Sequence, residues 1–430
     1  MNEYDSNRIL DLVKTIGYVS TKNILNTDCY VINTCHIREK ATDKVYHDVG
    51  RIKKKFKDKK KPILLVAGCV AQAESNEILK RDNYIDGVIG PQSYHLIPKM
   101  IKEIEDKKNK INNTEFDVIE KFDQLNLLRN TNSNISSFLT IQEGCDKFCH
   151  FCVVPYTRGP EHSRSFDEIL SEAKQLIDNG SKEIILLGQN VNAYKYKKHR
   201  LSDLINKLNS YKGLERIRYT TSHPKDMTDD LIETYQTCKK LMPLLHLPVQ
   251  SGSSKILKLM NRKHSIKKYL DIIQRLRKKR PSIKFSSDFM IGYPGENESD
   301  FNETVSLMKS IGFINSYSFV YSPRPGTPAS NLEIIDSEIS KKRLKIFQEI
   351  SDSIKKDYRK TLLNKKLEVL FENKMHKQSK YFGKDEYGDS VIVESKIDLT
   401  GKKLNVKINN FNQNTLFGEV IFNNNREVAA

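Results

Sequence analysis

Cys145, Cys149 and Cys152 form a C-x3-C-x2-C group within eight residues. Thiolates are the usual ligands of iron–sulfur clusters, and three in one loop can hold three corners of a 4Fe–4S cluster. No fourth cysteine follows nearby, so the fourth iron would keep an open position, as the metal of a catalytic zinc site does. The spacing also differs from that of two-cluster ferredoxins. We therefore predict a cluster whose open iron binds a substrate or a cofactor.

Cys35 and Cys69 form a second group. Each follows an apolar stretch that predicts a strand, over residues 28–33 and 62–67. The carboxyl ends of parallel strands meet at one edge of a sheet, where α/β proteins place their ligands. Shared metal ligation is the preferred interpretation, although two ligands are too few. Ordinary buried thiols are the alternative.

The elements that must position these residues follow an α/β pattern. Residues 1–105 predict a parallel α/β domain, with a helix over 9–16 and a third strand over 84–89. The domain opens on a helix, so its first strand is apparently missing. Residues 106–135 are polar and predict a linker.

Residues 136–360 repeat a strand–helix pattern six times, which predicts a partial (β/α)6 TIM-like barrel. Such folds gather their chemistry in the loops after the strands, and the three-cysteine group follows the first strand. The expected strands are 138–142, 183–187, 216–221, 244–248, 284–290 and 317–321. Residues 361–430 predict a small antiparallel β-barrel, with strands at 367–371, 390–394, 404–408 and 415–422.

The formal net charge of +18 predicts a polyanionic partner such as nucleic acid. Residues 51–61 contain eight basic residues in eleven; a solvated helix face is the other interpretation of this run. No apolar run has the length of a membrane span and no leader opens the chain. We therefore expect a soluble, cytoplasmic protein that has no membrane partner.

The three-cysteine spacing resembles the signature of radical S-adenosylmethionine (SAM) enzymes, and most of the chain resembles the methylthiotransferases of that family. The stretches that carry the resemblance include Met1-Asn-Glu-Tyr-Asp-Ser6, Asn33-Thr-Cys-His-Ile-Arg-Glu-Lys-Ala41, Cys152-Val-Val-Pro-Tyr-Thr-Arg-Gly159, Leu247-Pro-Val-Gln-Ser-Gly-Ser253 and Asp288-Phe-Met-Ile-Gly-Tyr-Pro-Gly-Glu296. The resemblance implies a methylthiotransferase domain, a radical SAM domain and a C-terminal TRAM domain that binds RNA.

The resemblance also implies the reaction: methylthiolation of N6-dimethylallyladenosine in tRNA, next to the anticodon. Two 4Fe–4S clusters and SAM are the implied cofactors. Cys145, Cys149 and Cys152 match the ligands of the SAM-binding cluster, and Cys35 and Cys69 match two of the three ligands of the auxiliary cluster. A flavodoxin or ferredoxin is the implied low-potential electron donor, and we expect a monomer.

One departure concerns the third auxiliary ligand. In the family it lies in a Gly-Cys-Gln-Met-Asn-Glu-Tyr-Asp-Ser stretch, and Met1 aligns with the Met of that stretch. The expected cysteine would lie two residues upstream of Met1. A start site called too late is the preferred explanation, and a chain that lacks this ligand is the alternative.

Several residues at strand ends are expected to contact SAM. A glycine allows close approach, and side-chain amides can bind polar atoms of the cofactor. Simple turn chemistry or packing is the alternative at each position. The expected cofactor-binding residues are Phe151, Gly188, Gln189, Asn190, Gln250 and Gly292.

Three functions remain in competition at this point. The first is the tRNA methylthiotransferase described above. The second keeps the chemistry but acts on threonylcarbamoyladenosine in tRNA or on an aspartate of a ribosomal protein. The third is a tRNA-binding radical SAM protein that cannot insert sulfur, because an auxiliary-cluster cysteine is missing. No residue is assigned as the hydrogen-abstracting or acid–base group.

Overall fold

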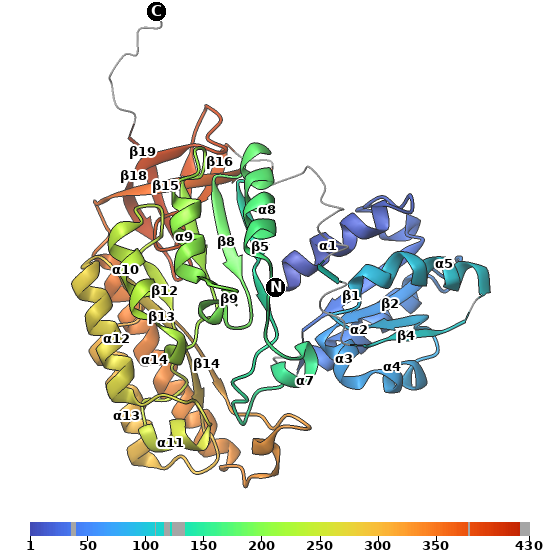
Figure 1. Ribbon diagram of the computed structural model, residues 1–430, viewed down its shortest axis with the longest axis horizontal. Coiled ribbons are helices and arrows are strands. Elements are labelled where there is room, and N and C mark those ends of the chain that lie inside the picture. Colours follow the sequence, from blue (N-terminus) through green and yellow to red (C-terminus); the bar gives the residue numbers. More distant parts are fainter. Residues whose placement is uncertain (36–39, 108, 116–120, 123–133, 377–378, 422–430) are drawn as a thin grey trace, which may run out of the picture.

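The computed structural model describes residues 1–35, 40–107, 109–115, 121–122, 134–376 and 379–421. Figure 1 shows an N-terminal α/β unit beside a larger central unit, with a small barrel at the far end of the central unit. Residues 36–39 of the motif around Cys35, and most of the expected linker, lie outside the described residues. No helix in these ranges is both long and apolar enough to cross a bilayer.

The N-terminal unit is built on a four-stranded parallel sheet in the order β1-β2-β3-β4. The apolar strand β2 is central and almost fully buried, as its continuous hydrophobic run predicts. The strands are β1 (Cys29–Thr34), β2 (Ile63–Gly68), β3 (Gly87–Ile89) and β4 (Ile111–Asn113). The helices are α1 (Asn2–Lys14), α2 (Lys40–Lys55), α3 (Cys69–Glu74), α4 (Asn76–Arg81) and α5 (Ile97–Lys107).

Strand β4 shows that the linker starts later in the chain than expected. Ile111–Asn113 pairs in parallel with Gly87–Ile89 and so belongs to the N-terminal sheet, not to a connection that was expected to start at residue 106. The sequence hides this strand because it is short and has one apolar residue in three. Pairing with its neighbour, rather than its own composition, makes the segment a strand.

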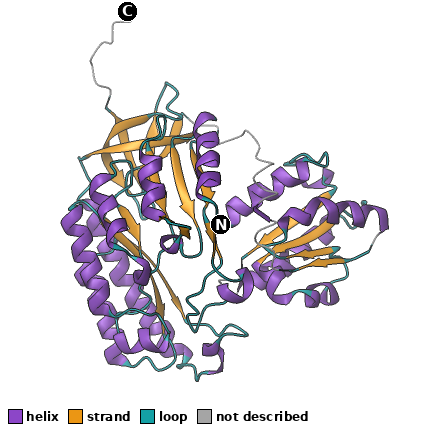
Figure 2. Cartoon of the chain, viewed as in Figure 1, coloured by secondary structure: helices purple, strands orange, loops and turns teal. Residues whose placement is uncertain are grey.

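The central unit contains six parallel strands with helices on their outer face (Figure 2). They form two three-stranded sheets, which meet at an isolated parallel bridge between Ile217 and Leu241. Strand β14 pairs only with β13, so the barrel stays open. The strands are β5 (Ser136–Thr140), β8 (Glu183–Leu187), β11 (Arg216–Tyr219), β12 (Leu244–His246), β13 (Lys284–Ile291) and β14 (Asn315–Val320).

The predicted partial (β/α)6 barrel is therefore confirmed. Its helices are α7 (Val154–Arg158), α8 (Phe166–Asp178), α9 (Leu201–Asn209), α10 (Asp229–Thr237), α11 (Ser254–Leu259), α12 (Ile266–Lys279), α13 (Glu298–Ile311) and α14 (Ser337–Lys360). Two short hairpins lie in its loops: β6 (Gln142–Glu143) with β7 (His162–Ser163), and β9 (Lys195–Tyr196) with β10 (His199–Arg200).

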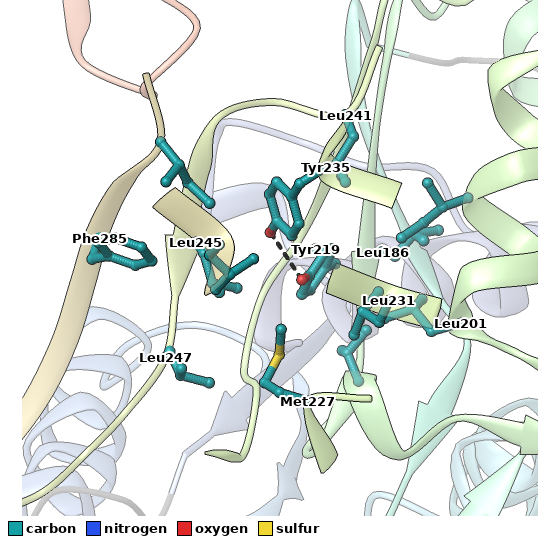
Figure 3. Close-up of a cluster of buried hydrophobic side chains, with 14 of the residues drawn as sticks. Leu186, Leu201, Tyr219, Met227, Leu231, Tyr235, Leu241, Leu245, Leu247 and Phe285 are labelled. Carbon is teal, nitrogen blue, oxygen red and sulfur yellow. Dashed lines mark hydrogen bonds between the residues drawn. The ribbon is translucent and has the colours of Figure 1, made fainter. Parts of the chain in front are cut away.

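One large apolar core holds the helices on this sheet. Figure 3 shows part of it, where leucines from strands and helices surround two tyrosines. The hydroxyl of Tyr235 donates a hydrogen bond of 2.9 Å to that of Tyr219. Both rings are buried, so this bond satisfies polar atoms that would otherwise be costly in an apolar interior.

The C-terminal unit is a closed five-stranded barrel in the order β15-β16-β17-β19-β18. Sequence reasoning found four of these strands and missed β16. All pairs are antiparallel except β17 with β19, which run parallel. The strands are β15 (Lys366–Lys374), β16 (Lys380–Lys384), β17 (Ser390–Glu394), β18 (Lys403–Phe411) and β19 (Thr415–Val420).

The barrel is attached to the amino ends of the central strands, away from the loops that follow their carboxyl ends. Arg216, the first residue of β11, is buried and donates hydrogen bonds to the carbonyls of Lys384 (2.7 Å), Asp385 (3.1 Å) and Glu368 (2.8 Å). Arg218 donates to the carbonyls of Asp385 and Glu386. Two arginines thus satisfy barrel carbonyls that this contact removes from water.

We expect the substitution Arg216→Met to lower the free energy of unfolding of the full chain by about 2–4 kcal/mol, because it leaves several buried carbonyls without a donor. Urea unfolding followed by circular dichroism would measure this change. The matched control is Arg275→Met, since Arg275 pairs with Asp229 on the surface and its loss should cost less than about 1 kcal/mol. Equal urea midpoints for the two variants would contradict the role given to Arg216.

Candidate metal centre

The cysteine loop, residues 145–152, leaves the carboxyl end of β5 through the short strand β6. The pairing of Gln142 with Ser163 closes the base of the loop. Within it, the amide of Cys152 donates to the carbonyl of Cys149 (2.9 Å), and that of Cys145 donates to Gly159 (3.2 Å). These bonds fix the backbone of the turn that carries the three predicted ligands.

The electrostatics of the cysteine loop suit a cluster. Burial raises the pKa of Cys145 to about 11 and that of Cys152 to about 12, and the neighbouring Cys149 contributes to both shifts. Three thiolates so close repel one another unless a cationic group binds them. No trio of His, Cys, Asp and Glu side chains in the described ranges converges on a single ion. A 4Fe–4S cluster does not require such convergence, because each thiolate binds its own iron, so these residues fit that group.

A second segment, which sequence reasoning missed, holds the cysteine loop from the other side. The amide of His150 donates to the carbonyl of Met260 (3.0 Å), and His150 Nδ1 lies 2.9 Å from the carbonyl oxygen of Leu259. Asn261 Nδ2 donates to the carbonyl of Phe148 (2.8 Å), a residue with φ of 47°. Residues 259–262, at the end of α11, therefore fix an otherwise unfavourable loop conformation.

The expected SAM-contact residues Gly188, Gln189 and Asn190 meet around a buried glutamine, Gln142. Its Oε1 accepts hydrogen bonds of 3.0 Å from the amides of both Gln189 and Asn190. A Cβ at Gly188 would lie 2.6 Å from the same oxygen, so only glycine fits there. Gln189 Oε1 in turn accepts from the amide of Gly144 (2.7 Å). This network ties the loop after β8 directly to the cysteine loop.

Two of the expected residues present buried acceptors that lack a partner. Asn190 donates through Nδ2 to Asp226 (2.8 Å), but its Oδ1 accepts from no group in the described chain. Gln250 has φ of 77°, and its buried Oε1 is also unsatisfied. Such atoms normally find a donor, so both fit a ligand that carries N–H or O–H groups.

The other two expected residues are placed differently. The amide of Gly292 already donates to Glu296 Oε1 (3.0 Å), and a Cβ there would lie 2.4 Å from Ser340 Oγ. Phe151 is partly buried and packs on an apolar cluster that includes Met290 and Tyr321. The observed contacts of Gly292 and Phe151 are with protein groups.

Cys35 and Cys69 follow paired strand ends, as predicted. Thr34 is the register partner of Gly68, so the next residues in the two strands are the two cysteines. A Cβ at Gly68 would lie 2.3 Å from the carbonyl oxygen of Thr34, and only glycine allows this approach. Asn33 Nδ2 donates to the carbonyl of Asn2 (3.0 Å), which places the start of α1 beside the end of β1.

A chain of buried charges joins the second cysteine pair to the cysteine loop. Arg158, in α7, donates to Asp5 of α1 (2.7 Å) and lies 3.8 Å from Glu143. Lys121 pairs with Glu143 at 2.7 Å. Burial alone would lower the pKa of Arg158, but Asp5, Cys69 and Glu143 together raise it well above its usual value. Cys69 therefore contributes to the electrostatic environment of Arg158. Arg158 itself comes six residues after the last cysteine of the cysteine loop.

Comparison with known proteins matches three regions of the chain to known families. Residues 139–308 match the Radical SAM superfamily, residues 1–90 match Uncharacterized protein family UPF0004, and residues 360–421 match the TRAM domain. Among solved structures, the radical S-adenosylmethionine methyltransferase TsrM from Kitasatospora setae, with cobalamin and a [4Fe-4S] cluster bound, is similar. Its TM-score is 0.56 at 10% identity, over 77% of this chain and 74% of TsrM. This likeness concerns the fold alone.

Curated relatives are much more similar in sequence. The tRNA-2-methylthio-N(6)-dimethylallyladenosine synthase of Pelagibacter ubique is 60% identical, over 100% of this chain and 97% of its own length. The enzymes of the same name from Rickettsia canadensis and Anaplasma phagocytophilum are 46% and 44% identical, each over 97% of its own length and over 98% and 99% of this chain. The chain therefore belongs to the family of tRNA-2-methylthio-N(6)-dimethylallyladenosine synthases, within the radical SAM superfamily.

Proposed function

We infer that the protein is a radical SAM methylthiotransferase that converts N6-dimethylallyladenosine in tRNA to its 2-methylthio derivative. The observation that carries this conclusion is that the chain contains two separate cysteine groups whose units are joined by a buried contact. The cysteine loop and the pair Cys35 and Cys69 lie in different units, and the buried contact of Arg158 with Asp5 connects them. The relatives carry the name of this activity, which favours it over the threonylcarbamoyladenosine and ribosomal-protein alternatives.

The cofactors are two 4Fe–4S clusters and SAM, and together they supply the radical and sulfur-transfer chemistry. The cysteine loop would hold the SAM-binding cluster, and Cys35 and Cys69 would hold two corners of the auxiliary one. The protein's own task is to position these groups around the substrate. Gln142 fixes the loop after β8, and residues 259–262 fix the cysteine loop.

The SAM contacts are proposed for the residues expected from sequence: Phe151, Gly188, Gln189, Asn190, Gln250 and Gly292. Asn190 and Gln250 have the strongest support, because their buried side-chain oxygens lack donors in the described chain. The ammonium group and the ribose hydroxyls of SAM are donors of the required kind. Gly188 would contribute indirectly, because the absence of a side chain leaves room for Gln142, which fixes the loop after β8.

Exposed aromatic side chains next to the cysteine loop suit an RNA substrate. Phe148 and Tyr156 are 51% and 48% exposed, and their ring centroids lie 6.3 Å apart. Single-stranded RNA loops are commonly recognised by stacking of unpaired bases on such rings. The net charge of +18 and the mostly exposed basic run at 51–61 would add affinity for phosphates.

The remaining assignments are proposals that follow from the family and the sequence. The enzyme would act as a cytoplasmic monomer and receive electrons from a flavodoxin or ferredoxin. Residues 1 to 113, which include β4, would form the methylthiotransferase domain, 136–360 the radical SAM domain and 361–430 the TRAM domain. The TRAM unit would bind tRNA at a distance from the chemistry, because it is attached to the opposite ends of the central strands.

Nucleoside mass spectrometry tests the function directly. We expect 2-methylthio-N6-dimethylallyladenosine in tRNA from a strain that lacks its own enzyme and expresses this chain or, if only the dimethylallyl nucleoside is found, this chain with Gly-Cys-Gln added before Met1. The variant with Ala at Cys145, Cys149 and Cys152 should leave only the dimethylallyl nucleoside. Methylthiolated threonylcarbamoyladenosine, or no modified tRNA from a protein that holds both clusters, would reject the assignment.

Equilibrium binding of SAM tests the contact at Gln250. We expect Gln250→Met to weaken binding to the cluster-loaded protein about tenfold, because one hydrogen bond to a charged donor is lost. Gln72→Met is the matched control, since Gln72 also has a buried, unpartnered Oε1 but lies in the N-terminal unit. Equal affinity of both variants for SAM would remove Gln250 from the site.

Iron content tests how the auxiliary cluster is completed. After anaerobic reconstitution, the iron content of the 430-residue chain is compared with that of the same chain carrying Gly-Cys-Gln before Met1. Because Asn2 is hydrogen-bonded to Asn33, two residues before Cys35, we expect the added thiol to raise the iron content by up to about four atoms per chain. The same extension with Ser in place of Cys is the control. Equal iron in all three proteins would contradict a ligand at this position.

A further inference from the structure

Arg262 is a buried cation without a carboxylate partner. It is 6% exposed, and it forms no ion pair with Asp or Glu within 4.0 Å in the described part of the chain. Its Nη2 donates to the carbonyl of Pro248 (2.6 Å), and its buried Nε has no partner there. Burying an uncompensated charge is costly, so a guanidinium retained here requires an anionic group close by.

That anionic group is in the cysteine loop. Arg262 Nη1 lies 3.5 Å from Cys149 Sγ, in hydrogen-bonding geometry. One of the three proposed cluster ligands thus accepts a hydrogen bond from a buried, fixed cation.

We propose that Arg262 is a positioning residue that raises the reduction potential of the SAM-binding cluster through its hydrogen bond to Cys149 Sγ. Reduction transfers one electron from an external one-electron reductant to the cluster and makes its negative charge larger by one. A fixed cation and an N–H···S bond stabilise this more negative state. The inference rests on the cluster assigned under "Proposed function".

Arg262 is also held rigidly in place. It is the last residue of the segment 259–262, which is hydrogen-bonded to the cysteine loop. Its own hydrogen bond to Pro248 connects this segment to the residues that precede Gln250. The donor is therefore held by packed elements on two sides. A side chain fixed in this way can act on the cluster without moving during the reaction.

The test is a redox titration of the full chain with Cys35→Ala and Cys69→Ala, so that only the cluster of the cysteine loop titrates. The protein is reconstituted anaerobically without SAM, reduced with dithionite and followed by EPR. The reference is the parent protein, which carries the two Ala substitutions and keeps Arg262. At the potential where its cluster is half reduced, we expect Arg262→Met to lower the ratio of reduced to oxidised cluster about three- to tenfold. Arg262→Lys, which retains the charge, should give an intermediate ratio.

Arg277→Met is the matched control, because Arg277 also donates to a backbone carbonyl, that of Ile311 (2.7 Å), and makes no contact with a cysteine in the described residues. If Arg262→Met leaves the ratio of reduced to oxidised cluster unchanged, the proposal is wrong. This holds even if the variant binds SAM more weakly. If Arg262→Met does not bind a cluster, Arg262→Gln is measured instead. A lowered ratio of reduced to oxidised cluster in Arg262→Gln would support the proposal, and an unchanged ratio would contradict it. Absence of a cluster from the parent protein would instead reject the proposed function.

Discussion

The buried contact of Arg158 with Asp5 is the interaction on which the composite site depends. Asp5 belongs to the first helix of the N-terminal unit, and Arg158 follows the cysteine loop of the central unit. Glu143 and Lys121 extend this contact into a network that is almost completely shielded from water. Removing one member of such a network leaves an uncompensated buried charge, which typically costs about 3–5 kcal/mol. The two cysteine groups are therefore held in one relative position.

Both cysteine groups have a buried arginine nearby. Arg262 donates to Cys149 in the cysteine loop, and Arg158 lies within electrostatic reach of Cys69. Iron–sulfur clusters bound by thiolates carry negative charge, and the charges and hydrogen bonds around them set their reduction potentials. The two arginines come from different elements, because Arg158 ends helix α7 and Arg262 follows helix α11.

Uncharged hydrogen bonds complete the positioning. Gln142 is fully buried and uses both ends of its amide: Oε1 accepts from two residues after β8, and Nε2 donates to the carbonyls of Glu143 and Gly144. It links the ends of two neighbouring strands at the point where the chemistry is expected. The C-terminal barrel, in contrast, is attached through Arg216 and Arg218 to the opposite ends of the strands. The cysteine loop and the C-terminal barrel thus lie at opposite ends of the central strands.

The sequence by itself determined the type of chemistry and most of the strands. Cysteine spacing is local, so three ligands within eight residues identify a cluster without any knowledge of the fold. Continuous apolar runs likewise predicted the parallel strands of both α/β units, because buried strands require them. Strand β4 was missed because its neighbour, rather than its own composition, stabilises it, and β16 was missed because its apolar stretch is only two residues long.

Only the tertiary structure decided which distant residues act on the cysteines. Arg262 lies 113 positions after Cys149, and Arg158 lies 153 positions after Asp5. No periodicity or motif relates such pairs, since their proximity results from the packing of whole units. The sequence indicated the proposed ligands, because ligation requires particular atoms at short spacing. The fold determined their electrostatic surroundings, because charge acts through space and is independent of position along the chain.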